Sequence, residues 1–210
     1  MTKFRYAAMS RRAALTGAAL ASLALVAGCG GGEAAATGDM ALGAAEGAPV
    51  TVVEYASVTC AHCAVWQETV WPQFKAKYVD TNKVRYVFRE YLTAMPDVGA
   101  AGFLIARCAG PDKYFDVVHQ IMSSQREWAA GVAPRDSLYR IAGAAGLSQE
   151  QTQACITDKD AINALEQRFK AAQDAGVNGT PTFMVNGVRV ADTSLEALST
   201  AIDAELAKQS

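Results

Sequence analysis

The chain has 210 residues, of which 51% are hydrophobic and 19% charged, and its formal net charge is −2. This composition is that of a globular protein of one domain with a buried core, and it excludes a disordered or collagen-like chain. The small negative charge argues against a broad basic surface for nucleic acid, and two histidines, His62 and His119, are too few for a His-rich metal site.

The first 28 residues predict an export signal. Four basic residues and no acidic one precede an uncharged run, Ala13–Gly28, that is rich in Ala, Leu and Val. A basic start followed by a short apolar run and small residues is typical of a secretory signal. The alternative is a short transmembrane anchor, although 16 residues are fewer than the roughly 20 that a membrane span needs.

The end of this segment, Val26-Ala27-Gly28-Cys29, resembles the bacterial lipobox, in which Cys29 becomes the lipid-modified first residue. The alternative is that Cys29 only lies near an ordinary cleavage site. Ser10-Arg11-Arg12 loosely resembles a twin-arginine export signal. Residues 30–48 contain 6 Gly and 7 Ala among 19 residues, so that 29–48 is predicted to be a lipidated cysteine with a flexible linker. Without residues 1–28 the net charge is −6, so charge would not bind the chain to an anionic membrane.

From residue 49 to 210 the pattern predicts an α/β domain. The β-branched run Val50–Ala56 and the alternating segment Lys83–Tyr91 predict two strands. Between them, a helical stripe of apolar residues begins at Cys63, and Pro72 is expected to kink or break that helix. Helices are expected at residues 97–109, 112–124, 135–145, 149–156 and 159–175, with Ser148 and Gln151 spaced as a capping box.

The C-terminal part predicts a hairpin and a final helix. Thr180–Val185 and Val188–Val190 flank Asn186-Gly187, which is a strong hairpin signal. The last helix is expected to begin near Ser194, with Thr193 and Glu196 spaced as a capping box. The order β-α-β, a helical insertion at about 95–175 and then β-β-α predicts a small sheet with helices on both faces.

Cys60-Ala61-His62-Cys63 lies where the first strand gives way to a helix. A sulfur at a helix N-terminus lies near unpaired N–H groups and the positive end of the helix dipole, which both favour thiolate. A protonated His62 adds positive charge, and Cys63 is close enough to close a small disulfide ring. These are the parts of a dithiol/disulfide redox couple.

Other interpretations of this motif are possible. A zinc knuckle needs a second ligand pair, but no other C-x-x-C occurs in the chain. A copper site is conceivable, because thiolates suit Cu(I). A purely structural disulfide is a third alternative, although so short a loop on a helix is a poor staple.

Three segments together resemble the DsbA family of thiol:disulfide interchange proteins: Thr59–Cys63, Glu54 and Gly179–Phe183. The resemblance implies a thioredoxin-like fold with an inserted helical subdomain. It also implies that Cys60 is the nucleophile, Cys63 the resolving thiol, Glu54 a buried carboxylate beneath the pair and Pro181 a cis-proline facing it. Ala61 departs from the proline that many oxidases carry there, and this dipeptide tunes the redox potential.

Further candidates come from the residues themselves. A carboxylate in a Val-rich strand is costly to bury unless it is used, so Glu54 is a candidate proton relay for Cys63; the alternative is a strand-edge Glu facing solvent. Cys108 and Cys155 are interpreted as a structural disulfide in an exported domain, with free thiols as the alternative. A cis bond before Pro181 would present the backbone of Thr180 to an extended substrate, whereas a trans proline would only end a turn. His119 is expected to be a packing or surface residue.

The expected function is that of a thiol:disulfide oxidoreductase, lipid-anchored and facing the periplasm, which donates its disulfide to exported proteins that carry free thiols. A membrane partner would reoxidise the pair, and no cofactor is expected. One alternative is a reductase or isomerase for a narrow set of clients. Another is a copper-binding chaperone without exchange turnover.

Overall fold

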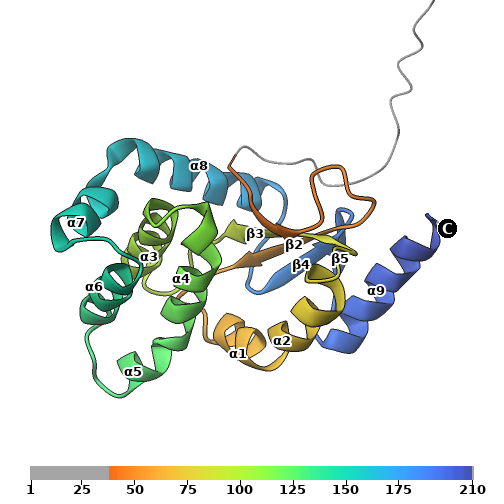
Figure 1. Ribbon diagram of the computed structural model, residues 1–210, viewed down its shortest axis with the longest axis horizontal. Coiled ribbons are helices and arrows are strands. Elements are labelled where there is room, and N and C mark those ends of the chain that lie inside the picture. The colour runs from red at the N-terminus through yellow and green to blue at the C-terminus, as the bar shows by residue number, and fades with distance from the viewer. Residues whose placement is uncertain (1–37, 210) are drawn as a thin grey trace, which may run out of the picture. The chain divides into compact units, whose positions relative to one another are not determined.

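The computed structural model describes residues 38–209 (Figure 1). The predicted signal segment, Cys29 and the residues up to 37 lie outside this range. The strands are β1 (Met40–Gly43), β2 (Thr51–Ala56), β3 (Arg85–Glu90), β4 (Thr182–Val185) and β5 (Val188–Val190). They form one sheet in the order β1-β3-β2-β4-β5. Only β2 and β3 pair in parallel; β1 with β3, β2 with β4 and β4 with β5 are antiparallel.

The helices of the described residues lie between the strands and after the last one. They are α1 (Ala61–Thr69), α2 (Trp71–Phe74), the π-helix η1 (Lys75–Val79), α3 (Pro96–Cys108), α4 (Pro111–Ser123), α5 (Gln125–Ala129), α6 (Pro134–Ala144), α7 (Gln149–Thr157), α8 (Lys159–Asp174) and α9 (Leu195–Ala207). The block α3–α8 lies between β3 and β4, which confirms the predicted helical insertion. The break near Pro72 is also present, because α1 ends at Thr69 and Pro72 lies in the first turn of α2.

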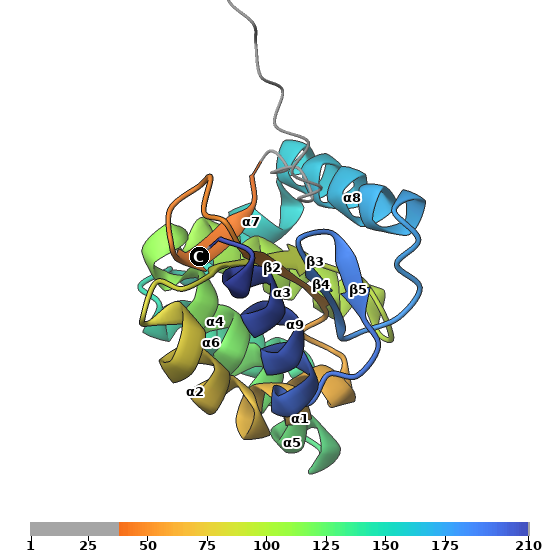
Figure 2. The same cartoon turned by 90° about the vertical axis from the view of Figure 1, so that its right-hand side faces the viewer.

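The two faces of the sheet carry separate apolar clusters. Alternate residues of β2 point to opposite faces: Val52 and Ala56 lie in the larger cluster, whereas Val53 and Tyr55 lie in the smaller one. Figures 1 and 2 show α1, α2 and α9 on one side of the sheet and α8 on the other. Because Glu54 shares the parity of Val52, its carboxyl is directed to the face that α1 covers.

A buried carboxylate attaches the insertion to the sheet. Glu90, at the end of β3, accepts from Arg107 Nε of α3 (2.5 Å), Arg168 Nε of α8 (2.7 Å) and the Tyr114 hydroxyl of α4 (3.1 Å). The Glu90 side chain is completely buried. Charge-assisted hydrogen bonds of this kind fix the orientation of α3 and α8 on β3, because a buried carboxylate has no water as an alternative partner.

The flexible linker predicted for residues 29–48 is wrong for Met40–Gly43, which form the edge strand β1. Met40 and Leu42 pack against the larger apolar cluster. The approach to β1 is also held: Arg107 donates two hydrogen bonds to the Gly38 carbonyl (3.1 Å each), and Arg89 forms an ion pair with Asp39 (2.9 Å). The Gly/Ala-rich composition did not reveal this strand, because the backbone hydrogen bonds to β3 and two apolar side chains are enough to order an edge strand.

Local capping signals gave mixed results. The capping box of Ser148 and Gln151 is present at the start of α7. The one expected from Thr193 and Glu196 is wrong, since Ser194 caps α9 by accepting from Ala197 N. The short helix α5 was not predicted at all, because its five residues hold no periodic apolar stripe.

Candidate active site

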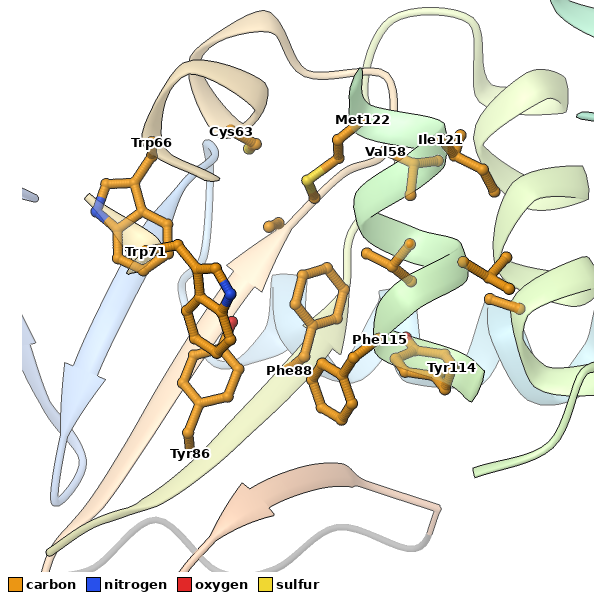
Figure 3. Packing of buried hydrophobic residues seen from close by; sticks show 14 of the residues in the cluster. Val58, Cys63, Trp66, Trp71, Tyr86, Phe88, Tyr114, Phe115, Ile121 and Met122 are labelled. Atoms are coloured by element: carbon orange, nitrogen blue, oxygen red, sulfur yellow. The ribbon is translucent and has the colours of Figure 1, made fainter. Parts of the chain in front are cut away.

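Cys60 occupies the N-cap position of α1, directly after the loop that ends β2. Its Sγ accepts a hydrogen bond from the backbone N–H of Cys63 (3.2 Å). Both cysteines are free thiols in this structure, Cys60 at 9% and Cys63 at 0% exposure. Figure 3 shows Cys63 facing the core, with Trp66 on one side and Met122 on the other in this view. One sulfur is thus at the surface edge and the other is shielded.

The two thiols differ in acidity. The pKa of Cys60 is lowered to about 6, first by the hydrogen bond from the Cys63 side chain and further by backbone N–H groups of the first turn, against the opposing effect of burial. The pKa of Cys63 is raised well above its usual range by burial and by the neighbouring Cys60. Cys60 is therefore the stable thiolate of the pair, and Cys63 is the thiol that holds its proton.

Glu54 lies on the same face of the sheet and is 2% exposed. The hydroxyl of Tyr86, on the neighbouring strand β3, donates a hydrogen bond to its Oε2. Burial raises the pKa of Glu54 to about 8, although the hydrogen bond from Tyr86 acts in the opposite direction. Its charge in turn raises the pKa of Cys63, which places it within electrostatic reach of the pair. The solvent-facing alternative for Glu54 is excluded by this burial.

The peptide bond between Thr180 and Pro181 is cis. The carbonyl oxygen of Thr180 lies 3.5 Å from Cys60 Sγ and accepts a hydrogen bond from the thiol when Cys60 is protonated. Two segments separated by 120 residues therefore meet at the reactive sulfur, because β4 pairs directly with β2.

The loop between Ala56 and the helix is ordered by its own hydroxyls. Ser57 Oγ accepts from the backbone N–H of Thr59 (3.3 Å) and shares a hydrogen bond with Thr59 Oγ1 (3.0 Å). Thr93, in the connection after β3, is 3.3 Å from Thr59 Oγ1. Tyr86 and Thr93 were not singled out from the sequence.

The remaining predicted residues lie at the margin of the pair or away from it. His62 is exposed in the first turn of α1. Cys108 at the end of α3 and Cys155 in α7 are joined by a disulfide, with their Cα atoms 6.2 Å apart. His119 packs against Trp71, and burial lowers its pKa to about 4, so it is a neutral packing residue.

The described part of the chain offers few metal donors close together. Between residues 38 and 209, no group of three or more His, Cys, Asp or Glu side chains is placed to hold a metal ion. Within the same range, none of the helices combines the length and the apolar character required to cross a bilayer. What the site does provide is a thiolate, a shielded thiol, a neutral carboxyl and the backbone carbonyl of Thr180 beside the reactive sulfur.

Comparison with known proteins agrees with this arrangement. Residues 35–204 match the family model described as Thioredoxin. A Rickettsia conorii protein named "Putative protein-disulfide oxidoreductase" is 39% identical over 175 residues, which cover 81% of this chain and 61% of that protein. A Bacillus cereus protein named "Probable disulfide bond formation protein D" is 28% identical, with 77% and 76% covered. The chain thus spans about three-fifths of the length of its Rickettsia relatives.

Solved structures give the same result. Wolbachia pipientis alpha-DsbA1 superimposes with a TM-score of 0.75 at 27% identity, covering 83% of this chain and 94% of that one. BdbD from Bacillus subtilis, at 20% identity, shares the fold with a TM-score of 0.74, covering 84% and 97%. The chain belongs to the thioredoxin family, and within it to the DsbA-like proteins, whose thioredoxin fold carries a helical insertion.

Proposed function

We propose that this chain is a protein thiol:disulfide oxidoreductase that uses the Cys60–Cys63 pair and acts as an oxidase. The observation that carries the proposal is the different setting of the two thiols: Cys60 Sγ accepts the N–H of Cys63 at the N-terminus of α1, whereas Cys63 is completely buried. A stable Cys60 thiolate favours the reduced form of the pair, and a pair that favours its reduced form is a strong oxidant of other thiols.

The reaction begins with the pair as a disulfide. A substrate thiolate attacks Cys60 Sγ, the Cys60–Cys63 bond breaks, and Cys63 leaves as a thiolate. A neutral Glu54 supplies the proton that Cys63 takes up, since its raised pKa keeps a proton on the carboxyl near neutrality. A second substrate thiolate then attacks the substrate sulfur of the mixed disulfide and releases Cys60 as a thiolate. The substrate loses two electrons, and the pair gains them.

The loop before β4 gives the substrate a place to bind. The Thr180 carbonyl points to Cys60 Sγ and is available to an extended peptide beside Pro181. We assign these two residues to substrate binding, because backbone pairing accepts many sequences and brings a client sulfur next to Cys60.

We further infer that the chain is exported and lipid-anchored through Cys29, that it faces the periplasm, and that a membrane partner reoxidises the pair. The basic start, the apolar run and the lipobox-like Val26–Cys29 support this location. The disulfide between Cys108 and Cys155 fits an oxidising compartment.

The test is the equilibrium of the Cys60–Cys63 pair with reduced and oxidised glutathione, combined with the oxidation of a reduced dithiol peptide. The oxidase assignment predicts a couple more oxidising than glutathione and stoichiometric oxidation of the peptide, which Cys60→Ser abolishes. A couple more reducing than glutathione would instead indicate a reductase or isomerase. Stoichiometric Cu(I) binding without oxidation of the peptide would indicate a copper chaperone.

A further inference from the structure

The loop that delivers Cys60 is held by a side chain from the helical insertion. Gln125, the first residue of α5, donates from Nε2 to the carbonyl oxygens of Val58 (2.8 Å) and Cys60 (3.2 Å). These bonds connect positions 65 to 67 residues apart in the sequence. They use both protons of the amide on two carbonyls of one short loop.

The two acceptors matter because of where they lie. The Cys60 carbonyl also accepts from Ala64 N (3.1 Å), which is the first backbone bond of α1. Gln125 therefore supports the turn in which Cys60 presents its Sγ to the N–H of Cys63. Its two N–H groups also place partial positive charge against carbonyl oxygens that lie near the reactive sulfur.

Helix α3 also packs against this loop, at the side chain of Val58. A Cβ at Gly102 would lie 3.0 Å from Val58 Cγ2, so the helix already touches the Val58 side chain. The loop is thus confined between α3 on its side-chain side and Gln125 on its carbonyl side. Movement of the Cys60 backbone requires either the loss of the amide hydrogen bonds or a displacement of the insertion.

We propose that Gln125 is a positioning residue that holds Cys60 at the N-terminus of α1 and thereby stabilises its thiolate. This inference rests on the proposed function and assigns to the insertion a direct part in the chemistry of the pair. Without the amide, the carbonyls of Val58 and Cys60 lose their donors, and the N–H groups of the first turn point less well at Sγ.

Two variants at one position separate the effect from simple packing. Gln125→Leu removes both donors, while Gln125→Glu keeps the shape and places acceptors, with a negative charge, against the two carbonyls. Gln67→Leu is the matched control, because Gln67 lines the same groove of about 490 Å³ as Gln125 but makes none of the loop contacts described above.

The pKa of Cys60 is measured in the full-length protein by alkylation with iodoacetamide over a pH series, with mass spectrometry of the Cys60 peptide. This readout separates Cys60 from every other cysteine. We expect Gln125→Leu to raise the pKa of Cys60 by about 0.5, Gln125→Glu to raise it further, and Gln67→Leu to leave it unchanged. At pH 7 the Leu change corresponds to a two- to threefold less oxidising equilibrium with glutathione, by roughly the same arithmetic.

Two results would overturn the inference. One is a wild-type pKa for Cys60 in both folded Gln125 variants. The other is a lower melting temperature with no change in the pH profile, which indicates structural support only. A wild-type Cys60 that itself titrates near the ordinary thiol value contradicts the proposed function instead, and the two failures are therefore distinguishable.

Discussion

The carboxyl of Glu54 has a different pKa in the folded and in the unfolded chain. Burial raises its pKa to about 8 in the folded protein, against an ordinary value of 4.5. Below pH 4.5 the carboxyl is protonated in both states, so it does not reduce the free energy of unfolding. Between pH 4.5 and 8 only the unfolded chain releases it, so the stability contributed by this group falls as the pH rises.

Replacing Glu54 by Gln removes this pH dependence. The free energy of unfolding of the variant, minus that of the parent protein, should increase by about 2–3 kcal/mol as the pH rises from 4 to 7. The measurement is urea unfolding at several pH values in a Cys60→Ser/Cys63→Ser background, which removes titration of the thiols. The exposed Glu196→Gln serves as control. An unchanged difference between variant and parent across this range contradicts the burial argument.

At the scale of single residues, the sequence identified those that a short motif marks. Cys60 and Cys63 are three apart, Glu54 stands out as a charge in an apolar strand, and Pro181 interrupts another. Tyr86 was only one inward-facing aromatic among several, because its pairing with Glu54 depends on the offset between two strands. Gln125 carries no local signal, since its partners lie more than sixty residues away.

Elements were predictable where periodicity is sustained. Helices α3, α4, α6, α7 and α8 of the insertion agree with the pattern of apolar residues, and the hairpin β4–β5 agrees with Asn186-Gly187. Strand β1 and helix α5 were missed because each has four or five residues, too few to show a period. What holds β1 in place is its tertiary setting: the ladder with β3, the packing of Met40 and Leu42 on the larger cluster, and the hydrogen bond from Ala44 N to the Val84 oxygen.

Gly43→Ala tests how tightly the edge strand is docked. Gly43 has φ +79°, and a Cβ there would lie 2.5 Å from the Val84 oxygen, which accepts the N–H of Ala44. Gly47 has φ +85° with open space around it, so Gly47→Ala carries the backbone cost alone. We expect Gly47→Ala to cost about 1 kcal/mol and Gly43→Ala about 2–3 kcal/mol, measured by denaturant unfolding. Equal losses for the two variants would mean that β1 shifts away from Val84 at little cost and is not tightly docked.

The disulfide between α3 and α7 stabilises the insertion by closing a long loop. Its cysteines are 47 residues apart, and the chain-entropy argument gives about 4 kcal/mol as an upper figure. The double variant Cys108→Ala/Cys155→Ala should lose about 2–4 kcal/mol in free energy of unfolding. Exchange at Cys60 should persist, because Cys108 lies nine residues along α3 from Gly99, where an added Cβ would lie 3.7 Å from Thr59 Oγ1. Loss of exchange in a folded variant would show that the two disulfide sites are coupled.

At the scale of the whole molecule, the described domain begins earlier in the sequence than composition predicted, which shortens the tether that the proposed anchor at Cys29 would have. With Gly38 and Asp39 already held by Arg107 and Arg89, eight residues separate Cys29 from the domain. Eight residues span at most about 28 Å when fully extended. The sequence could not reveal this, because the boundary is set by contacts to β3 and α3 rather than by a change in composition.

Cys29→Ala tests the proposed anchor. The net charge of −6 after residue 28 offers no electrostatic substitute for a lipid, so the variant should move from the membrane to the soluble fraction of fractionated cells. Cys108→Ala/Cys155→Ala, in which Cys29 is intact, is the control and should stay with the membrane. A Cys29→Ala variant that fractionates as the parent does would show that the lipobox interpretation is wrong.

The way in which the chain enters the domain has a mechanical consequence. Tension applied ahead of Gly38 is first carried by the hydrogen bonds from Arg107 and by the ion pair of Asp39 with Arg89, then by the β1–β3 ladder. Because β1 is an edge strand that pairs with β3, this load enters β3 and α3 before it reaches β2 and α1. A force that separates β1 from β3 therefore breaks contacts at the edge of the sheet first. These contacts lie outside the turn at the start of α1 that holds Cys60 and Cys63.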